Sequence, residues 1–94
     1  MSAYLVGHIS VKNDKLWQKY VAGVQESLSA YESKIVFRGQ LVSVLAGEHE
    51  YDRVVVIEFR DHSTLDDWYH SEKYQSLIAI REEAVNVVIT SYEA

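Results

Sequence analysis

The sequence predicts an α+β fold whose elements follow the order βαββαβ, a four-stranded antiparallel sheet with two helices on one face. Two observations predict it: four short segments are rich in β-branched residues, and two longer segments between them have helical periodicity. The expected strands cover residues 4–11, 35–45, 53–60 and 86–92. With right-handed crossovers the expected strand order is 4-1-3-2. The chain has 94 residues, no Pro and only 4 Gly, so we expect one domain over residues 1–94 without a linker.

The first strand and the first helix are defined by alternation and by capping residues. Residues 4–11 alternate in polarity and are rich in β-branched side chains, which is typical of a strand. Asn13 and Asp14 follow, and their side chains can accept hydrogen bonds from the free backbone N–H groups at a helix start. Apolar residues then recur at steps of three and four over residues 17–31, which places them on one helical face.

The second strand is less regular than the third. Residues 35–45 have strand character but are interrupted near Gly39, and a glycine inside a strand often marks a bulge. Residues 46–52 are polar and predict a turn. Residues 53–60 form the clearest strand in the chain, because residues 54–57 are Val, Val, Val and Ile.

The second helix is expected to contain a break. The segment Ser63-Thr64-Leu65-Asp66 resembles a capping box, so a helix should run from there to about Tyr69. Ser71 offers a second N-cap only a few residues later. We therefore expect a break near His70, after which the helix continues over residues 72–83.

The predicted strands divide into two faces, because side chains alternate across a strand. One face is apolar and is expected to lie under the helices, where Gly7 would let a helix approach closely. Its residues are Leu5, Gly7, Ile9, Val11, Ile35, Phe37, Val55, Ile57, Phe59, Val87 and Ile89. The opposite face mixes apolar and polar side chains. Its residues are Tyr4, Val6, His8, Ser10, Val36, Arg38, Val54, Val56, Glu58, Arg60, Asn86, Val88, Thr90 and Tyr92.

The mixed face predicts a homodimer. A contiguous apolar patch is unusual on a monomer, whereas single exposed apolar residues are normal. A ferredoxin-like sheet with one uncovered, partly apolar face commonly dimerises through it, and two copies then form a dimeric α/β barrel. A two-fold dimer is also the commonest oligomer. The alternative is a monomer with a modestly apolar open sheet.

Composition and charge exclude several classes of protein. The chain has 9 Lys plus Arg against 14 Asp plus Glu, a net charge of -5, which argues against a general nucleic-acid binder. It has no Cys, which excludes disulfides, thiol catalysis and metal sites that need Cys. The apolar runs fall far short of the roughly 18 residues of a membrane span, and we expect no signal peptide, because no basic region precedes a long apolar core at the N-terminus. We therefore expect a cytoplasmic protein with no membrane partner.

No cofactor is expected from the motifs. The sequence contains neither GxGxxG nor a P-loop, so nucleotide cofactors have no support. The four His residues show no metal-ligand spacing, so no metal is expected either.

Three polar residues are candidates for a ligand-binding site on the mixed face. Parity places Glu58 between His8 on the first strand and Arg38 on the second. The carboxylate could orient the imidazole, or the guanidinium could hold an acidic ligand. The simpler interpretation is an Arg38–Glu58 salt bridge inside the dimer interface, with His8 as packing.

Two aromatic residues complete the candidate set. Trp68 and Tyr74 have large rings with one polar atom each and could line the mouth of a ligand pocket. Rings of this kind are more often part of a core or an interface, and that interpretation is favoured.

Several segments together carry a family resemblance. They are Phe37-Arg38-Gly39, Leu45-Ala46-Gly47-Glu48, Asp52-Arg53-Val54-Val55-Val56-Ile57-Glu58-Phe59 and Trp68-Tyr69-His70-Ser71-Glu72-Lys73-Tyr74-Gln75-Ser76-Leu77, followed by Arg81. Through them, over nearly its whole length, the chain resembles the domain-of-unknown-function family 1330 of the dimeric α/β-barrel superfamily. It departs from the family pattern at Glu32-Ser33 and at Gln40, where the family usually has Gly.

The resemblance implies a βαββαβ subunit and a dimer, but it implies no settled activity. Superfamily relatives include cofactor-free monooxygenases, isomerases, haem-degrading enzymes and stress-response proteins, and a shared fold does not choose among them. Two hypotheses therefore stand. The first is a protein that binds a small organic acid or an aromatic metabolite between sheet and helices, with cofactor-free proton transfer or oxygenation as its chemistry. The second is a noncatalytic dimeric module with no small-molecule substrate.

Overall fold

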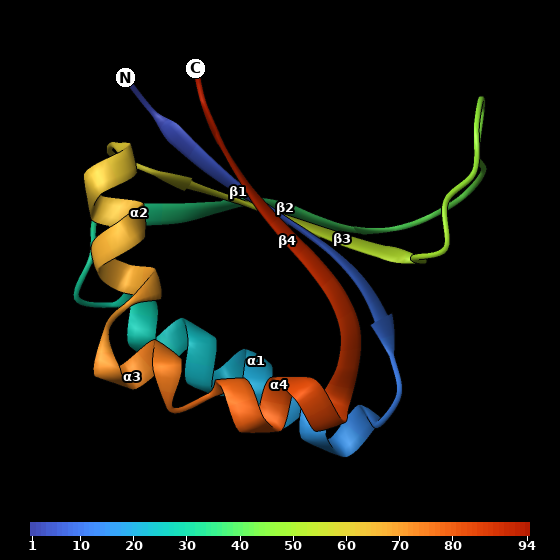
Figure 1. Cartoon of the computed structure of the whole chain (residues 1–94), viewed down its shortest axis with the longest axis horizontal. Coiled ribbons are helices and arrows are strands. Elements are labelled where there is room, and N and C mark those ends of the chain that lie inside the picture. The colour runs from blue at the N-terminus through green and yellow to red at the C-terminus, as the bar shows by residue number, and fades with distance from the viewer.

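All helices lie on one side of a four-stranded antiparallel sheet in the computed structural model, which describes residues 1–94 (Figure 1). The strands are β1 (Ala3–Val11), β2 (Ser33–Gln40), β3 (Arg53–Phe59) and β4 (Val85–Glu93). The helices are α1 (Asp14–Leu28), α2 (His62–Tyr69), α3 (Glu72–Gln75) and α4 (Ile78–Ala84). The strand order is β2-β3-β1-β4, so the predicted ferredoxin-like α+β class and its strand order are confirmed. None of the helices has both the length and the hydrophobicity that a membrane span requires.

The first two helix starts are capped by side chains. Asn13 caps α1 as predicted, because its Oδ1 accepts a hydrogen bond from the backbone N–H of Leu16 at 3.1 Å. The predicted start of α2 is wrong by two residues. Asp61 is the N-cap, and its Oδ1 accepts from both the backbone N–H and the hydroxyl of Thr64, at 2.8 and 2.7 Å. Asp61 keeps the extended backbone of the preceding strand, which leaves the predicted box inside the first turn.

The predicted break near His70 is confirmed. Ser71 is the N-cap of α3, and its Oγ accepts from the backbone N–H of Tyr74 at 3.2 Å. A continuous helix over residues 72–83 is wrong, because the helix is interrupted between α3 and α4. The interruption brings Leu77 against α1, where a Cβ added at Gly23 would lie 2.6 Å from Leu77 Cδ2. The absence of a side chain at Gly23 therefore permits this close contact.

A β-bulge in β2 changes which side chains face the helices. Ile35 pairs with Ile57 of β3, but Phe37 pairs with Val56, so Val36 is an extra residue with no partner. An extra residue reverses the alternation of every side chain beyond it. Phe37, predicted to lie under the helices, is therefore on the open face. The expected position of the bulge at Gly39 is also wrong by about three residues.

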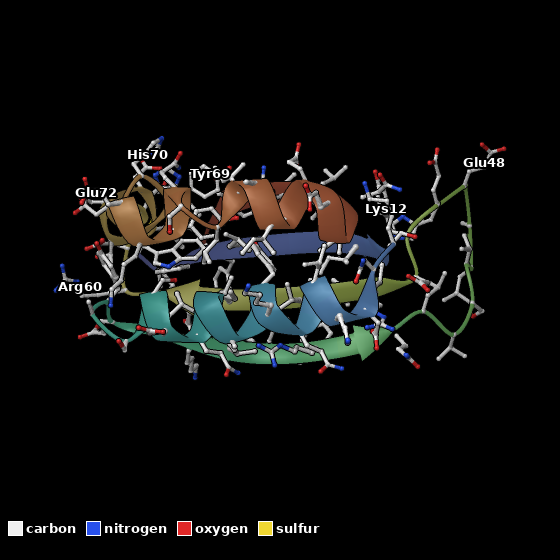
Figure 2. All side chains as sticks on the ribbon, turned by 90° about the horizontal axis from the view of Figure 1, so that it is seen from below. Lys12, Glu48, Arg60, Tyr69, His70 and Glu72 are labelled. Atoms are coloured by element: carbon white, nitrogen blue, oxygen red, sulfur yellow. The ribbon has the colours of Figure 1, made fainter.

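The strand β2 ends at Gln40 rather than near residue 45 as predicted. Its partner β3 begins only at Arg53, so residues 41–52 form a loop without strand pairing. One backbone hydrogen bond, from Leu41 N to Asp52 O at 2.7 Å, closes the base of this loop. Residues 41–50 are all exposed. Figure 2 shows Glu48 at the tip of this loop, well beyond the end of the sheet.

The core lies between the helices and the central strands, and it is small. Only 16 of 94 residues are buried, and the main cluster consists of Ala3, Leu5, Tyr20, Val24, Leu28, Ile57, Phe59, Leu65, Trp68 and Tyr74. The expectation that Gly7 lets a helix approach is wrong. A Cβ added there would meet only Val55 and Ile9, at 3.1 and 3.9 Å, and no helix atom within 4 Å. The space above Gly7 belongs to a cavity.

The opposite face of the sheet carries no helix (Figure 1). Four large apolar side chains on it are between 43% and 55% exposed, namely Val36, Phe37, Val88 and Tyr92. Half-buried Val6, Val54 and Val56 lie on the same face, since Val6 pairs with Val56 across β1 and β3. The single chain therefore leaves a broad apolar surface in contact with water.

Candidate ligand-binding site

A cavity of about 460 Å³ lies between the sheet and the helices. It is lined by 20 residues, of which 14 are hydrophobic. Its apolar walls include Leu5, Ile9, Trp17, Val21, Val24, Val55, Ile57, Val85, Val87 and Ile89. This volume falls within the roughly 300–1,000 Å³ of ordinary small-molecule sites, which are likewise mostly apolar with a few polar groups.

Three phenols and one guanidinium form a hydrogen-bonded group, of which Tyr20, Tyr74 and Arg81 line the cavity. The hydroxyls of Tyr20 and Tyr74 are 2.8 Å apart. Arg81 Nη1 donates to the hydroxyl oxygen of Tyr74 at 3.0 Å and to that of Tyr69 at 3.3 Å. Burial, with Tyr74 beside it, raises the pKa of Tyr20 well above its ordinary value, so this phenol stays protonated at neutral pH. The group therefore offers O–H and N–H donors rather than a base.

A second polar group lies at the β2–β3 edge of the cavity. The bulge places Arg38 opposite Val55, on the helix-facing side, where Arg38, Gln40 and Arg53 all line the cavity. Neither Arg38 nor Arg53 belongs to any of the salt bridges of the structure. The Nε atom of Arg53 is buried and has no hydrogen-bond partner. No Asp or Glu lines the cavity, so its ionised groups are all positive.

Besides Arg38, two of the candidate residues, Trp68 and Tyr74, line the cavity. Their ring centroids are 4.5 Å apart, and both side chains are fully or almost fully buried, so they belong to the core as well. Trp68 Nε1 donates to Ser27 Oγ at 2.9 Å, which fixes the indole in place. They form an inner wall rather than the mouth considered from the sequence, and their contact with a ligand stays a prediction.

The predicted Arg38–Glu58 pair is wrong. Glu58 pairs with Lys34 in the register of β2 and β3, and Lys34 Nζ is 3.5 Å from its Oε1. Tyr4 donates its hydroxyl to Oε2 at 3.1 Å. Hydrogen bonds from Ser2 and Tyr4, with Lys34 nearby, hold the pKa of Glu58 below its ordinary value. The prediction failed because the register places Lys34, four residues before Arg38, opposite Glu58. The bulge in addition turns Arg38 to the other face, and Glu58 does not line the cavity.

His8 lies on the open face, away from the cavity. Its ring packs edge-on against His49 with centroids 4.9 Å apart, and Tyr51 packs on His49 at 5.8 Å. The Nδ1 atom of His8 is buried without a hydrogen-bond partner. The structure therefore separates His8, Arg38 and Glu58, which the sequence had placed together.

Arg53 and Arg81 were missed as candidates by reasoning from the sequence alone. A signal for Arg53 was available, because it has the same parity as Val55 and Ile57 and is a charged residue on an otherwise apolar face. Arg81 had been noted only as part of the family resemblance. Its approach to Tyr74 depends on the packing of α4 and has no local sequence signal.

The order of the elements and the four-stranded antiparallel sheet with its helices on one face define the class of protein as a ferredoxin-like α+β domain. The chain belongs to the family DUF1330, a domain of unknown function, whose family model matches residues 2–93. None of the curated proteins matches the sequence.

Several solved structures share the fold at low identity. The protein RPA0582 of unknown function from Rhodopseudomonas palustris has a TM-score of 0.84 at 13% identity, over 99% of this chain and 82% of that chain. SnoaB, a cofactor-independent oxygenase from Streptomyces nogalater, has a TM-score of 0.69 at 10% identity, over 99% of this chain and 92% of that chain. A dimeric ferredoxin-like protein of unknown function from Thermobifida fusca has a TM-score of 0.69 at 14% identity, over 100% and 92%. At such identities the likeness establishes the fold alone.

Proposed function

We propose that this protein is a homodimer that binds a small organic acid or an aromatic metabolite in the cavity between its sheet and its helices. The observation that carries the proposal is an apolar cavity of about 460 Å³ with polar side chains at only a few points of its wall. Apolar walls with a small number of placed donors are the usual construction of a small-molecule site. The aromatic rings of Trp17, Tyr20, Trp68 and Tyr74 in the lining suit a flat or apolar ligand body.

The polar groups of the cavity restrict the chemistry that it could support. No His, Asp or Glu lines it, so the chain offers no ordinary general base there. Its guanidinium and phenol groups are donors, which suit an oxyanion, a carboxylate or a carbonyl oxygen. Cofactor-free proton transfer or oxygenation would therefore require a ligand that ionises readily once its anion is stabilised by these donors. Binding is the part of the proposal that the geometry supports best.

The open face of the sheet supports the dimer. Its apolar side chains cannot be covered by the helices, which occupy the other face (Figure 1). A second copy of the same face would bury them by two-fold symmetry. Proteins described as dimeric share the fold, among them the one from Thermobifida fusca.

A ligand screen by thermal shift tests the binding function. A ligand at a hundredfold excess over its Kd should stabilise the protein by about 2.7 kcal/mol. Val21→Trp fills the cavity from α1, because Val21 is half-buried in its lining. Lys19→Trp is the matched control, since it introduces the same ring on an exposed position of the same helix.

Compounds that bind in the cavity should lose their thermal shift with Val21→Trp and keep it with Lys19→Trp. Circular dichroism should confirm that both variants are folded, and Val87→Phe, which fills the cavity from β4, provides a second variant. Hits that are insensitive to both fillings would place the site elsewhere. The absence of any hit across a broad set of organic acids and aromatic compounds would instead favour the noncatalytic interaction module.

A further inference from the structure

We propose that Arg38 and Arg53 form an anion-binding site at the β2–β3 edge of the cavity, so that the ligand has an apolar body and a carboxylate or a similar oxyanion. This inference rests on the proposed function, because it assumes that the cavity holds a small molecule. It goes further because it states that anionic ligands bind more tightly than neutral ones, and because it names the two side chains that distinguish them.

The register of β2 and β3 places the two arginines on the same face and close together. Arg38 is opposite Val55, and Arg53 is opposite Gln40, so the two arginines are diagonal neighbours on adjacent strands. Diagonal neighbours of this kind lie roughly 7–8 Å apart at the backbone, within reach of two long side chains that converge on one group. Both residues line the cavity, which has apolar walls beyond them.

The bulge is what brings Arg38 into this position. If Val36 paired with Val56 in a regular ladder, alternation would place Arg38 on the open face, as the sequence predicted. Bulges are frequent next to functional sites, where they redirect a side chain. Here the bulge adds a second positive charge beside Arg53 on a face that is otherwise apolar.

The three arginines in the lining differ in how many hydrogen bonds and salt bridges they already make. Arg81 already donates to Tyr69 and Tyr74, and its Nε is 3.4 Å from Glu82 Oε2. Arg38 and Arg53 have no carboxylate partner, and Arg53 Nε is buried without a hydrogen bond. Leaving a buried donor unpaired is unfavourable, and two neighbouring guanidinium groups repel each other. An anion between them would relieve both effects.

The charge of the cavity lining is opposite to that of the whole chain. The protein carries a net charge of -5, yet the lining of the cavity contains three Arg and no Asp or Glu. A guanidinium pairs with a carboxylate through two parallel hydrogen bonds, which gives both strength and orientation. The apolar part of such a ligand would then extend from the Arg pair towards the aromatic wall.

Matched acids and amides test the proposal, because each pair has the same shape and differs in charge. The probes are 2-naphthoate and octanoate with their primary amides, titrated by calorimetry at low and moderate salt. Each acid should bind about 10- to 100-fold more tightly than its amide, the range for hydrogen bonds to a charged group. Arg38→Gln and Arg53→Gln should each remove most of this difference and leave amide binding unchanged. Arg60→Gln is the control, since Arg60 lies outside the cavity and pairs with Asp61.

The outcomes separate the inference from the proposed function. Equal affinity for acid and amide, or acid binding that survives both Arg substitutions, would overturn the anion site while leaving the cavity as a binding site. Failure of every probe to bind would overturn the inference together with the proposed function. If Arg53→Gln does not fold, Arg53→Lys retains the charge without the planar fork and should still weaken acid binding. Arg38 is exposed, so Arg38→Gln remains a test in either case.

Discussion

Tyr74→Phe tests the hydrogen-bonded group in the cavity wall by removing one oxygen. Tyr74 is fully buried, and its hydroxyl joins Tyr20 at 2.8 Å to Arg81 at 3.0 Å. Its removal leaves the buried hydroxyl of Tyr20 with no hydrogen-bond partner in the structure. An unsatisfied buried polar group costs about 1–3 kcal/mol. For a domain of this size each 1 kcal/mol lowers Tm by about 4–8 °C.

Urea denaturation of the variant and of a matched control measures this effect. Tyr31→Phe is the control, because the hydroxyl of Tyr31 makes no hydrogen bond and the residue is only partly buried. Tyr31→Phe should leave the free energy of unfolding nearly unchanged. Tyr20→Phe combined with Tyr74→Phe should cost less than the sum of the two single changes, with a coupling of about 0.5–3 kcal/mol. Additive costs, or a Tyr74→Phe variant as stable as the control, would refute this account of the cavity wall.

Three further predictions concern the helix break, the dimer and the response to acid. Ser71→Ala should lower the free energy of unfolding by about 0.5–2 kcal/mol through the loss of the α3 cap, and an unchanged urea midpoint would count against the cap. Val56→Asp should dissociate or unfold the dimer, as measured by sedimentation at micromolar concentration. Ala79→Asp, at an exposed position of α4, is the control and should leave the dimer intact. A wild-type protein that sediments as a monomer at this concentration would disprove the dimer. The pKa of Glu58 is lowered in the folded state, so its carboxylate stabilises the protein above the ordinary pKa of 4.5, and this contribution is lost as the pH falls. Glu58→Gln should therefore be less stable than wild type at pH 7, with the difference shrinking below pH 4.5; a constant difference would contradict the assignment.

Local patterns were sufficient for most of the fold. The break at His70 could be predicted from Ser71, because its side chain caps α3 through a contact with Tyr74, only three residues away. The strand order followed from the element order and the handedness of crossovers. These features depend on near neighbours in the sequence or on general rules of chain topology, so one sequence is enough to predict them.

The candidate site was harder to predict, because a bulge is a property of two strands. Whether Val36 has a partner depends on where β3 pairs with β2, and no residue near Val36 signals it. One missed residue reversed the faces of Phe37 and Arg38. The expected partner of Glu58 was wrong for a separate reason, because the register of β2 and β3 places Lys34 opposite Glu58. The packing of His8 with His49 could not be predicted either, because it depends on the path of the loop over residues 41–52.

The bulge also bears on how this family could diversify. If Val36 were kept and paired with Val56 in a regular ladder, Arg38 would turn away from the cavity and Phe37 into it, while the cap at Asn13 and the pairing of β1 with β3 and β4 would be untouched. A substitution changes one side chain at a time, whereas a change in the pairing of Val36 would exchange a cation for an aromatic ring in the cavity wall. A homologue whose β2 pairs with β3 without the bulge would therefore place an aromatic ring where this chain has Arg38.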